Sequence, residues 1–287
     1  MSGAAPSEDG PLPVWVDGRL RTGPDRAGVD PLDAGLRSGW GVFETLRVRG
    51  TSAATAEEHL ARLLAGAARL GIAVDADVVR GALADTLAAP RPLDEVVARL
   101  TVTAGPVAPD RWPAEPVGRP TVTVTLHPAP PLPAPAASAV RVAARRWPAD
   151  VKTTSYVASV LAGQEAQARG ADVAVLVDGE ELLETSDGNL LALVAGTLIT
   201  PAADGRLLPG VTRGRVLAAA ADLGIDVAEA PLHVGDLWAA ETVLVTSAVR
   251  GVRTLHRLDD RPLAGADVDG AAPHPLVTAL RGAVSPA

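Results

Sequence analysis

The chain of 287 residues contains no cysteine, one lysine and few aromatic side chains. The lack of cysteine excludes disulfides and thiolate metal sites, and no metal centre is predicted from the sequence. Aromatic residues make up 2% of the sequence, which is too few for platforms that stack on nucleic-acid bases. The net charge of −8, without any concentrated basic tract, also argues against a nucleic-acid partner. A small-molecule enzyme is therefore the leading class.

Long apolar runs are also missing, because none reaches the roughly 18 residues of a membrane span. The N-terminal sequence has no basic segment followed by an apolar core, so a signal peptide is not expected. Residues 1–12 are predicted to form a disordered lead-in. We expect a cytoplasmic protein without a membrane partner, and the hydrophobic content of 47% fits a compact globular chain.

The single lysine is Lys152, whereas arginine occupies 25 positions. A coding bias toward arginine explains the missing lysines, and one lysine can survive such a bias by chance. The chemical alternative is that arginine stays protonated, while a lysine amine can lose its proton and attack a carbonyl. Composition alone leaves both interpretations open.

The first half of the chain predicts an α+β domain over residues 13–126. Apolar residues at helical spacing indicate helices at 55–72 and 76–88, the first with a possible capping box of Thr55 and Glu58. Alternating or β-branched segments indicate strands at 41–50, 95–105 and 119–127, and residues 14–20 indicate a strand, an Asp-Gly turn and the start of a second strand. The proline-rich residues 127–139 are predicted to be an interdomain linker.

The second half, residues 140–287, predicts a larger domain that mixes strands with short helices. It lacks the regular βαβ alternation of a doubly wound sheet. The elements expected there are a strand at 140–147, a helix at 156–169, short strands within 172–201, a helix starting near Thr212 and a last strand at 241–256. Within this last segment, VTSAVRG at 245–251 could add hydroxyls and amides to a phosphate cup or could be a turn.

Chemistry at a reactive lysine needs partners that the sequence offers. With pyridoxal 5'-phosphate (PLP), the lysine needs an acid for the pyridine nitrogen and a cup for the phosphate. Glu184 is a candidate acid, although a solvated acid beside Glu180 and Glu181 is the simpler interpretation. The Pro-Gly turn before Thr212 would present free N–H groups to an anion, although an ordinary capped helix is commoner. Each signal is weak when taken singly.

Taken in order, these segments resemble the class IV, or fold-type IV, PLP-dependent aminotransferase family. The matching stretches are GWGVFETLRV, HLARL, VKTTSY, DVAVLVDGEELLETSDGNL, GTLITP, LLPGVTR and ETVLVTSAVRGV. The resemblance implies PLP as cofactor, a homodimer, and a two-domain α+β fold in which a small N-terminal domain precedes a larger C-terminal pseudo-barrel domain.

The resemblance also implies roles for individual residues. Lys152 matches the lysine that forms the Schiff base and moves the proton, and Glu184 matches the acid at the pyridine nitrogen. Tyr156 matches a tyrosine at the cofactor's ring hydroxyl, although a helix residue packed into the core is an alternative. Phosphate-binding positions are implied at Arg62, Val211, Thr212 and Ser247, although a helix-surface arginine is the alternative for Arg62. Two further cofactor-binding positions are Thr246 and Asn189, of which Asn189 gives structural support.

Substrate residues are harder to assign. The FET motif at 43–45 resembles aminodeoxychorismate lyases and puts Thr45 near the reacting centre, while Ser38 replaces a tyrosine usual in branched-chain and D-amino acid aminotransferases. Arg99 and Arg111 fit two basic positions of the lyases, although a strand-edge and a solvated-loop arginine explain them equally well. Trp40, and the absence of asparagine three residues after the lysine, depart from the family pattern.

The leading hypothesis is a PLP-dependent lyase that converts 4-amino-4-deoxychorismate to 4-aminobenzoate and pyruvate, a step toward folate. Two arginines would hold the two carboxylates of this small amino substrate. The alternative is a class IV aminotransferase acting on branched-chain or D-amino acids and 2-oxo acids. A non-catalytic binding protein on the same fold is a third possibility.

Overall fold

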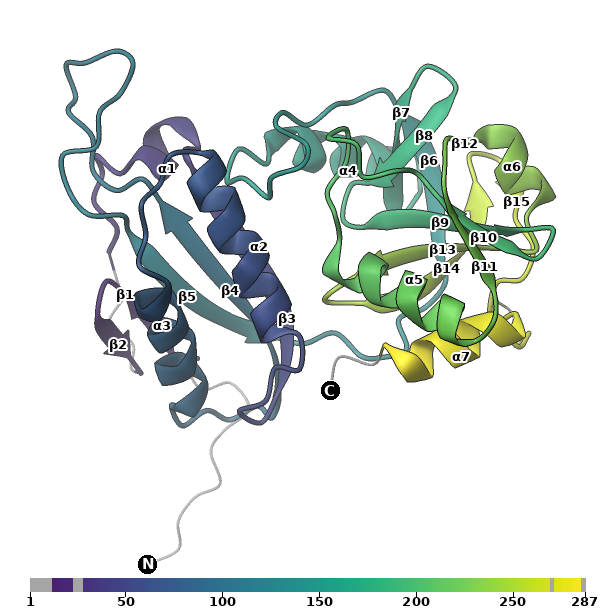
Figure 1. The fold of residues 1–287 in the computed structure, drawn as a ribbon, viewed down its shortest axis with the longest axis horizontal. Coiled ribbons are helices and arrows are strands. Elements are labelled where there is room, and N and C mark those ends of the chain that lie inside the picture. Colours follow the sequence, from purple (N-terminus) through teal and green to yellow (C-terminus); the bar gives the residue numbers. More distant parts are fainter. Residues whose placement is uncertain (1–11, 23–27, 269–270, 285–287) are drawn as a thin grey trace, which may run out of the picture. The chain divides into compact units, whose positions relative to one another are not determined.

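The computed structural model describes residues 12–22, 28–268 and 271–284, so the lead-in expected at residues 1–12 lies outside the described residues except for Leu12. The described chain has an α+β fold and divides into two compact units (Figure 1). One unit runs to Ala129 and takes in Val151–Ser155, whereas the other comprises Pro130–Asp150 and the chain from Tyr156 onward. No helix of the described residues is long and apolar enough to span a bilayer.

The first unit is built on an antiparallel sheet with the strand order β2-β1-β5-β4-β3. Its strands are β1 (Val14–Val16), β2 (Arg19–Arg21), β3 (Gly41–Arg49), β4 (Glu95–Thr103) and β5 (Val122–Pro128). Helix α2 (Ala56–Arg69) packs on β3 and α3 (Ala76–Ala88) on β1 and β5, so both cover one face of the sheet (Figure 1). Leu60 and Leu63 of α2 and Val79 of α3 are buried there, as the helical spacing of apolar residues requires.

A short helix, α1 (Ala34–Ser38), precedes β3. The buried Asp33 carboxylate caps it by accepting from the Gly35 N–H at 2.7 Å, and also accepts from the hydroxyls of Thr103 and Thr121 at 2.7 and 2.6 Å. One carboxylate thus ties α1 to β4 and to the residue before β5. The helix ends at Gly39, whose φ of +67° is a left-handed conformation that glycine tolerates best.

The second unit contains a closed barrel. Strands β9, β13, β14, β6, β7 and β8 pair in that order, and the pairing of Glu184 in β8 with Asn189 in β9 closes the ring. The barrel strands are β6 (Ala137–Val142), β7 (Val173–Asp178), β8 (Glu181–Thr185), β9 (Asn189–Val194), β13 (Thr242–Ser247) and β14 (Gly251–Leu258). Strands β10 (Thr197–Thr200), β11 (Asp226–Glu229), β12 (Leu232–His233) and β15 (Arg261–Pro262) extend the sheet.

Helices pack around this barrel (Figure 1). Helix α4 (Val157–Ala168) lies on β6 and β7, while α5 (Val211–Asp222) and α7 (Pro275–Ala283) pack together, α5 also contacting β13 and α7 contacting β14. Helix α6 (Val234–Ala239) contacts β9 and β12. The apolar side chains of α5 and α7, among them Val216 and Leu280, share one buried cluster with the sheet.

Several sequence expectations need correction. The predicted linker at 127–139 is shorter, because β5 continues to Pro128 and β6 begins at Ala137. Residues 151–155, expected within the second domain, pair with the first unit. The single strand expected at 241–256 is the hairpin β13–β14, which turns at 248–250. Thr55 precedes α2 but makes no side-chain cap.

Candidate functional site

The segment that carries Lys152 lies beside β3 in the first unit and pairs with it through an isolated bridge between Thr153 and Val42. Phe43 donates its N–H to the Lys152 carbonyl at 2.9 Å, and Thr154 donates its N–H to the Gly41 carbonyl at 2.8 Å. The Thr154 and Ser155 hydroxyls both donate to the Gly39 carbonyl, at 2.8 and 3.1 Å. The threonine and serine after the lysine therefore fix the segment in place.

The Lys152 amine lies over an aromatic ring. Its Nζ is 4.8 Å from the centroid of the Phe43 ring, and the Arg99 guanidinium carbon is 3.7 Å from the same centroid. Phe43 is buried, and Thr45 lies directly across the β3–β4 ladder from Arg99. Lys152, Arg99 and Thr45, which the sequence separates widely, thus belong to one neighbourhood around the only phenylalanine. The lone phenylalanine was the signal that could have drawn attention to this ring.

Arg62 belongs to a buried ionic group in the first unit. Its guanidinium donates to both carboxylate oxygens of Glu44, at 2.6 and 2.8 Å, while His59 Nδ1 lies 2.7 Å from Glu44 Oε2. Burial alone would raise the pKa of Glu44, but hydrogen bonds from His59 and Arg62 outweigh it and lower the pKa to about 2. The Glu44 carboxylate therefore holds Arg62 rigidly, and the phosphate contact expected of Arg62 stays a prediction.

Three other residues singled out by the sequence have local partners. Ser38 is exposed and donates its hydroxyl to the Ala34 carbonyl of its own helix. Arg111 lies in an exposed loop and forms an ion pair with Glu115 at 2.8 Å. Trp40 donates its indole N–H to the Leu70 carbonyl at the end of α2, so its contact there is structural. These contacts neither require nor oppose the substrate roles expected of Ser38 and Arg111.

In the second unit, Glu184 is buried, so the simpler interpretation of this residue as a solvated acid is wrong. Its Oε1 accepts from Arg146, at 2.9 Å from Nε and 2.5 Å from Nη2, and its Oε2 accepts from the Leu208 N–H at 3.1 Å. Arg146 also donates to the Ala149 carbonyl. Sequence reasoning missed Arg146, because a basic residue 38 positions away gives no local signal.

The remaining expected cofactor residues also lie in the second unit. Tyr156, half-buried, donates its hydroxyl to the Ser186 carbonyl at 3.3 Å, and burial raises its pKa, so it stays a proton donor at neutral pH. Ser247 accepts from the Arg250 N–H at the end of β13. The buried hydroxyl of Thr246 has no hydrogen-bond partner among the residues that the structure describes. An orphaned hydroxyl of this kind is typical of a place where a bound molecule completes the bonding.

Val211 and Thr212 form the first turn of α5. The N-cap residue is Gly210, which has no side chain to accept from the N–H groups of that turn. Such a helix N-terminus attracts phosphate through its free N–H groups and its dipole.

The residues present therefore fit PLP. The chain offers one lysine amine, a buried carboxylate, an uncapped helix N-terminus and a buried hydroxyl without a partner, which together match the functional groups of the cofactor. Among the residues that the structure describes, no cluster of acidic or histidine side chains is arranged to hold a metal ion.

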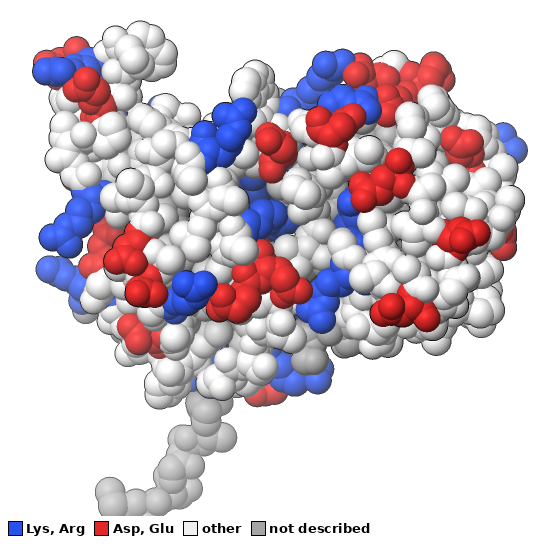
Figure 2. Space-filling view, viewed as in Figure 1, with Lys and Arg blue, Asp and Glu red and all other residues white. Residues whose placement is uncertain are grey.

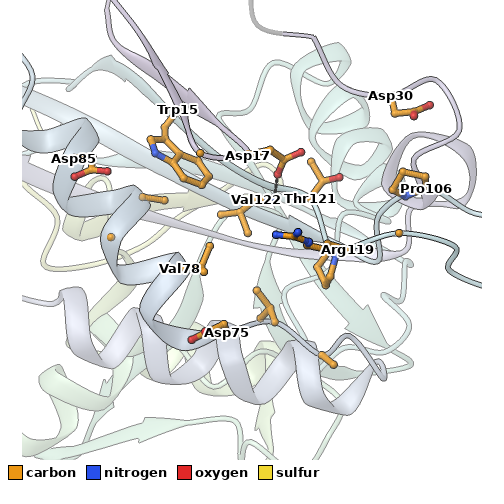
Figure 3. Close-up of a pocket in the computed structure, with 17 residues that line it drawn as sticks. Trp15, Asp17, Asp30, Asp75, Val78, Asp85, Pro106, Arg119, Thr121 and Val122 are labelled. Atoms are coloured by element: carbon orange, nitrogen blue, oxygen red, sulfur yellow. Dashed lines mark hydrogen bonds between the residues drawn. The ribbon is translucent and has the colours of Figure 1, made fainter.

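The first unit also contains a cavity of about 960 Å³, and no expected site residue lines it (Figure 3). Trp15 and Val78 give it apolar walls, and Asp17, Asp75 and Arg119 point toward it from separate segments. The carboxylates of Asp17 and Asp75 each accept a hydrogen bond from a nearby backbone N–H.

On the face shown in Figure 2, acidic and basic side chains are interspersed and form no continuous basic tract.

Comparison with known proteins gives a consistent result. The sequence model of the family described as "Amino-transferase class IV" matches residues 41–258. A D-alanine aminotransferase of Listeria innocua is 31% identical over 260 residues, covering 86% of this chain and 88% of the relative.

Two solved structures extend the comparison. A branched-chain aminotransferase from Thermoproteus uzoniensis, with norvaline, has a TM-score of 0.82 at 26% identity, covering 95% of this chain and 93% of that one. The 4-amino-4-deoxychorismate lyase from Pseudomonas aeruginosa has a TM-score of 0.77 at 27% identity, covering 94% and 97%. The sequence and the fold therefore lead to one group of proteins.

Proposed function

Within the class IV aminotransferase family, to which the chain belongs and whose enzymes use PLP, we propose that this protein is a lyase that converts 4-amino-4-deoxychorismate to 4-aminobenzoate and pyruvate. The observation that carries the proposal is the contact of Lys152 and Arg99 with the same Phe43 ring. It gives a reactive amine a guanidinium neighbour suited to a substrate carboxylate.

When bound, PLP supplies an electron sink: it accepts the electron pair that remains on the substrate carbon bearing the nitrogen when a bond to that carbon breaks. Lys152 would hold the cofactor through its ε-amine and act as the base toward the substrate carbon that bears the nitrogen. Glu184 would keep the proton on the pyridine nitrogen. The first turn of α5 would bind the phosphate through the N–H groups of Val211 and Thr212.

Arg99 would orient the substrate by binding a carboxylate with its forked donors, while Thr45 lies opposite it on the neighbouring strand. As the proton leaves, the bond from the ring to the enolpyruvyl oxygen breaks and the ring becomes aromatic. The two products contain every atom of the substrate. The lyase reaction therefore needs no amino acceptor.

A second candidate is amino transfer from a D-amino acid or a branched-chain amino acid to a 2-oxo acid. It is supported by the similarity to the D-alanine aminotransferase and to the branched-chain aminotransferase. The same lysine would then return the proton at the cofactor, and a 2-oxo acid would be consumed. Against it stands Ser38, an exposed serine where the resemblance leads us to expect a substrate-binding tyrosine.

The test is to incubate the PLP-loaded enzyme with 4-amino-4-deoxychorismate alone. We expect equimolar 4-aminobenzoate and pyruvate, measured by fluorescence and by a lactate dehydrogenase assay, and no product with Lys152→Ala. Arg99→Gln should raise KM about tenfold or more, because it removes a charged hydrogen bond. Arg49→Gln, on the exposed end of β3, should leave KM unchanged.

The opposite outcome is equally clear. If no 4-aminobenzoate forms without a 2-oxo acid, while D-alanine or a branched-chain amino acid is deaminated in its presence, the lyase proposal fails and the aminotransferase replaces it. The homodimer and the cytoplasmic location that the sequence leads us to expect stay predictions.

A further inference from the structure

The loop between β10 and α5 is held by side chains of two barrel strands. Leu208 donates its N–H to Glu184 Oε2 at 3.1 Å, and its carbonyl accepts from Asn189 Nδ2 at 2.8 Å. Both polar backbone groups of one residue are thus bonded to side chains. The neighbouring Leu207 is buried, so the loop has little freedom just before the helix begins.

The two side chains act from paired positions. Glu184 in β8 lies directly across the ladder from Asn189 in β9, and Asn189 lies across from Thr246 in β13. Directly opposed residues place their side chains on the same face of a sheet. The acid expected at the pyridine nitrogen, the amide that holds Leu208 and the buried hydroxyl without a partner therefore share one face.

Gly210 brings Asn189 close to the start of α5. A Cβ added at Gly210 would overlap Asn189 Oδ1, although the backbone of Gly210, with φ −68° and ψ 132°, suits any residue. The glycine is needed for the amide side chain and not for the turn. Asn189 therefore contacts the N-cap residue of α5 as well as the loop before it.

The other side of the first turn is anchored separately. Arg213 is buried and donates to the Thr200 hydroxyl at 3.2 Å, to the Pro201 carbonyl at 2.8 Å and to Glu229 at 2.7 Å. Arg213 is held at the end of β10, while Asn189 holds Leu208 and Gly210, the residues that lead into α5. Two independent sets of bonds thus define the position of Val211 and Thr212.

We propose that Asn189 is a positioning residue for the cofactor's phosphate: it holds Leu208 and Gly210 so that the first turn of α5 meets the phosphate while Glu184 meets the pyridine nitrogen. This positioning role rests on the proposed function, in which Glu184 and the first turn of α5 bind PLP. Asn189 contacts Leu208 and Gly210, so it would act on the phosphate through the loop. Its loss should therefore weaken recognition of the phosphate and spare recognition of the ring.

The test compares PLP with pyridoxal, which lacks the phosphate, in titrations of the apo-protein followed by tryptophan fluorescence. We expect Asn189→Ala to lose about tenfold in affinity for PLP, the factor that matches one lost hydrogen bond, and less than about twofold for pyridoxal. Ser138→Ala loses a hydrogen bond to Asp172 in the same barrel and should change neither affinity.

A second variant tests the same contact without removing the amide. Gly210→Ala should produce the same selective loss, and adding Asn189→Ala to it should bring no further loss, because the overlap disappears with the amide. Circular dichroism checks that each variant is folded. Should Asn189→Ala fail to fold, the single Gly210→Ala variant decides.

The proposed phosphate site and the positioning role of Asn189 can fail separately. If the wild type binds PLP no better than pyridoxal, the phosphate site and the positioning role are both overturned. If the wild type prefers PLP and the variants keep that preference, or lose both affinities equally, the phosphate site stands and the positioning role of Asn189 is overturned.

Discussion

Glu44 and Glu184 are buried carboxylates, and each accepts hydrogen bonds from an arginine. Burying an ion pair costs desolvation free energy, which the direct bonds offset only when the geometry is good. Each glutamate uses both of its oxygens. At the residue scale, these two groups are held rigidly enough to position what lies beside them.

The lowered pKa of Glu44 predicts a pH-dependent contribution to stability. Since the folded pKa of about 2 lies below the ordinary value of 4.5, this contribution is complete above pH 4.5 and is lost as the pH falls toward 2. Glu44→Gln should lower the free energy of unfolding by about 3 kcal/mol at neutral pH. Urea denaturation at pH 7, 4 and 3 should show the gap to the wild type narrowing with acidity.

The matched control for Glu44 is Glu57→Gln. Glu57 pairs with Arg80 on the surface, and exposed pairs contribute little. This variant should stay close to the wild type at every pH. A gap between Glu44→Gln and the wild type that is equally large at pH 7 and pH 3 would contradict the assignment of the low pKa to Glu44.

At the level of single residues, the sequence predicted residues that belong to a local motif but missed contacts between residues from distant segments. Lys152 stood out because it is the only lysine, and Glu184 because of the segment around it. Arg146 and Phe43, which contact them, come from distant segments that no local spacing connects. Tertiary pairing creates these contacts.

Among the elements, the short extended segment that carries Lys152, residues 151–155, has the most direct bearing on the proposed catalysis. Its hydroxyls donate to the carbonyl of Gly39, the left-handed residue that ends α1. A Cβ added at Gly39 would overlap the Ser155 Oγ, so a side chain there would push the segment away. The C-terminus of α1 therefore sets where the lysine lies.

Gly39→Ala should lower kcat about 10- to 100-fold, because small displacements of a catalytic group are costly. Gly71→Ala is the matched control: its φ of +72° imposes the same backbone strain, but nothing lies within 4 Å of the added Cβ. Thermal denaturation should show a similar stability loss for both variants. Equal kcat values in the two variants would contradict the role of the Gly39–Ser155 contact.

Elements with clear periodicity were the predictable ones. Helix α3 occupies residues 76–88 as expected, and α2 and β4 lie within their expected ranges. Helix α1 was missed because five residues are too few to show a helical period. The β13–β14 hairpin was read as one strand because its turn residues, Ala248–Arg250, carry no Gly-Asp or Asn-Gly signal.

For the molecule as a whole, the α+β class and the family followed from the order of the motifs, and the family match over residues 41–258 confirms both. The exact division of the chain did not follow. Residues 151–155 belong to the first unit and bridge to β3, and the hydrophobic pattern does not reveal which strand a short segment will pair with. Closure of the barrel through Glu184 and Asn189 is likewise a long-range outcome.

Whether Lys152 carries the cofactor can be tested directly because of the composition of the whole chain. Because these 287 residues include one lysine, the ε-amine of Lys152 and the N-terminal amine are the primary amines that they offer to the cofactor's carbonyl. The measurement is borohydride reduction of the PLP-loaded protein, followed by mass spectrometry of its peptides. We expect close to one pyridoxyl group per chain on Lys152 and none at this position in Lys152→Ala. Label confined to the N-terminal amine, in equal amount in the wild type and in Lys152→Ala, would contradict this expectation.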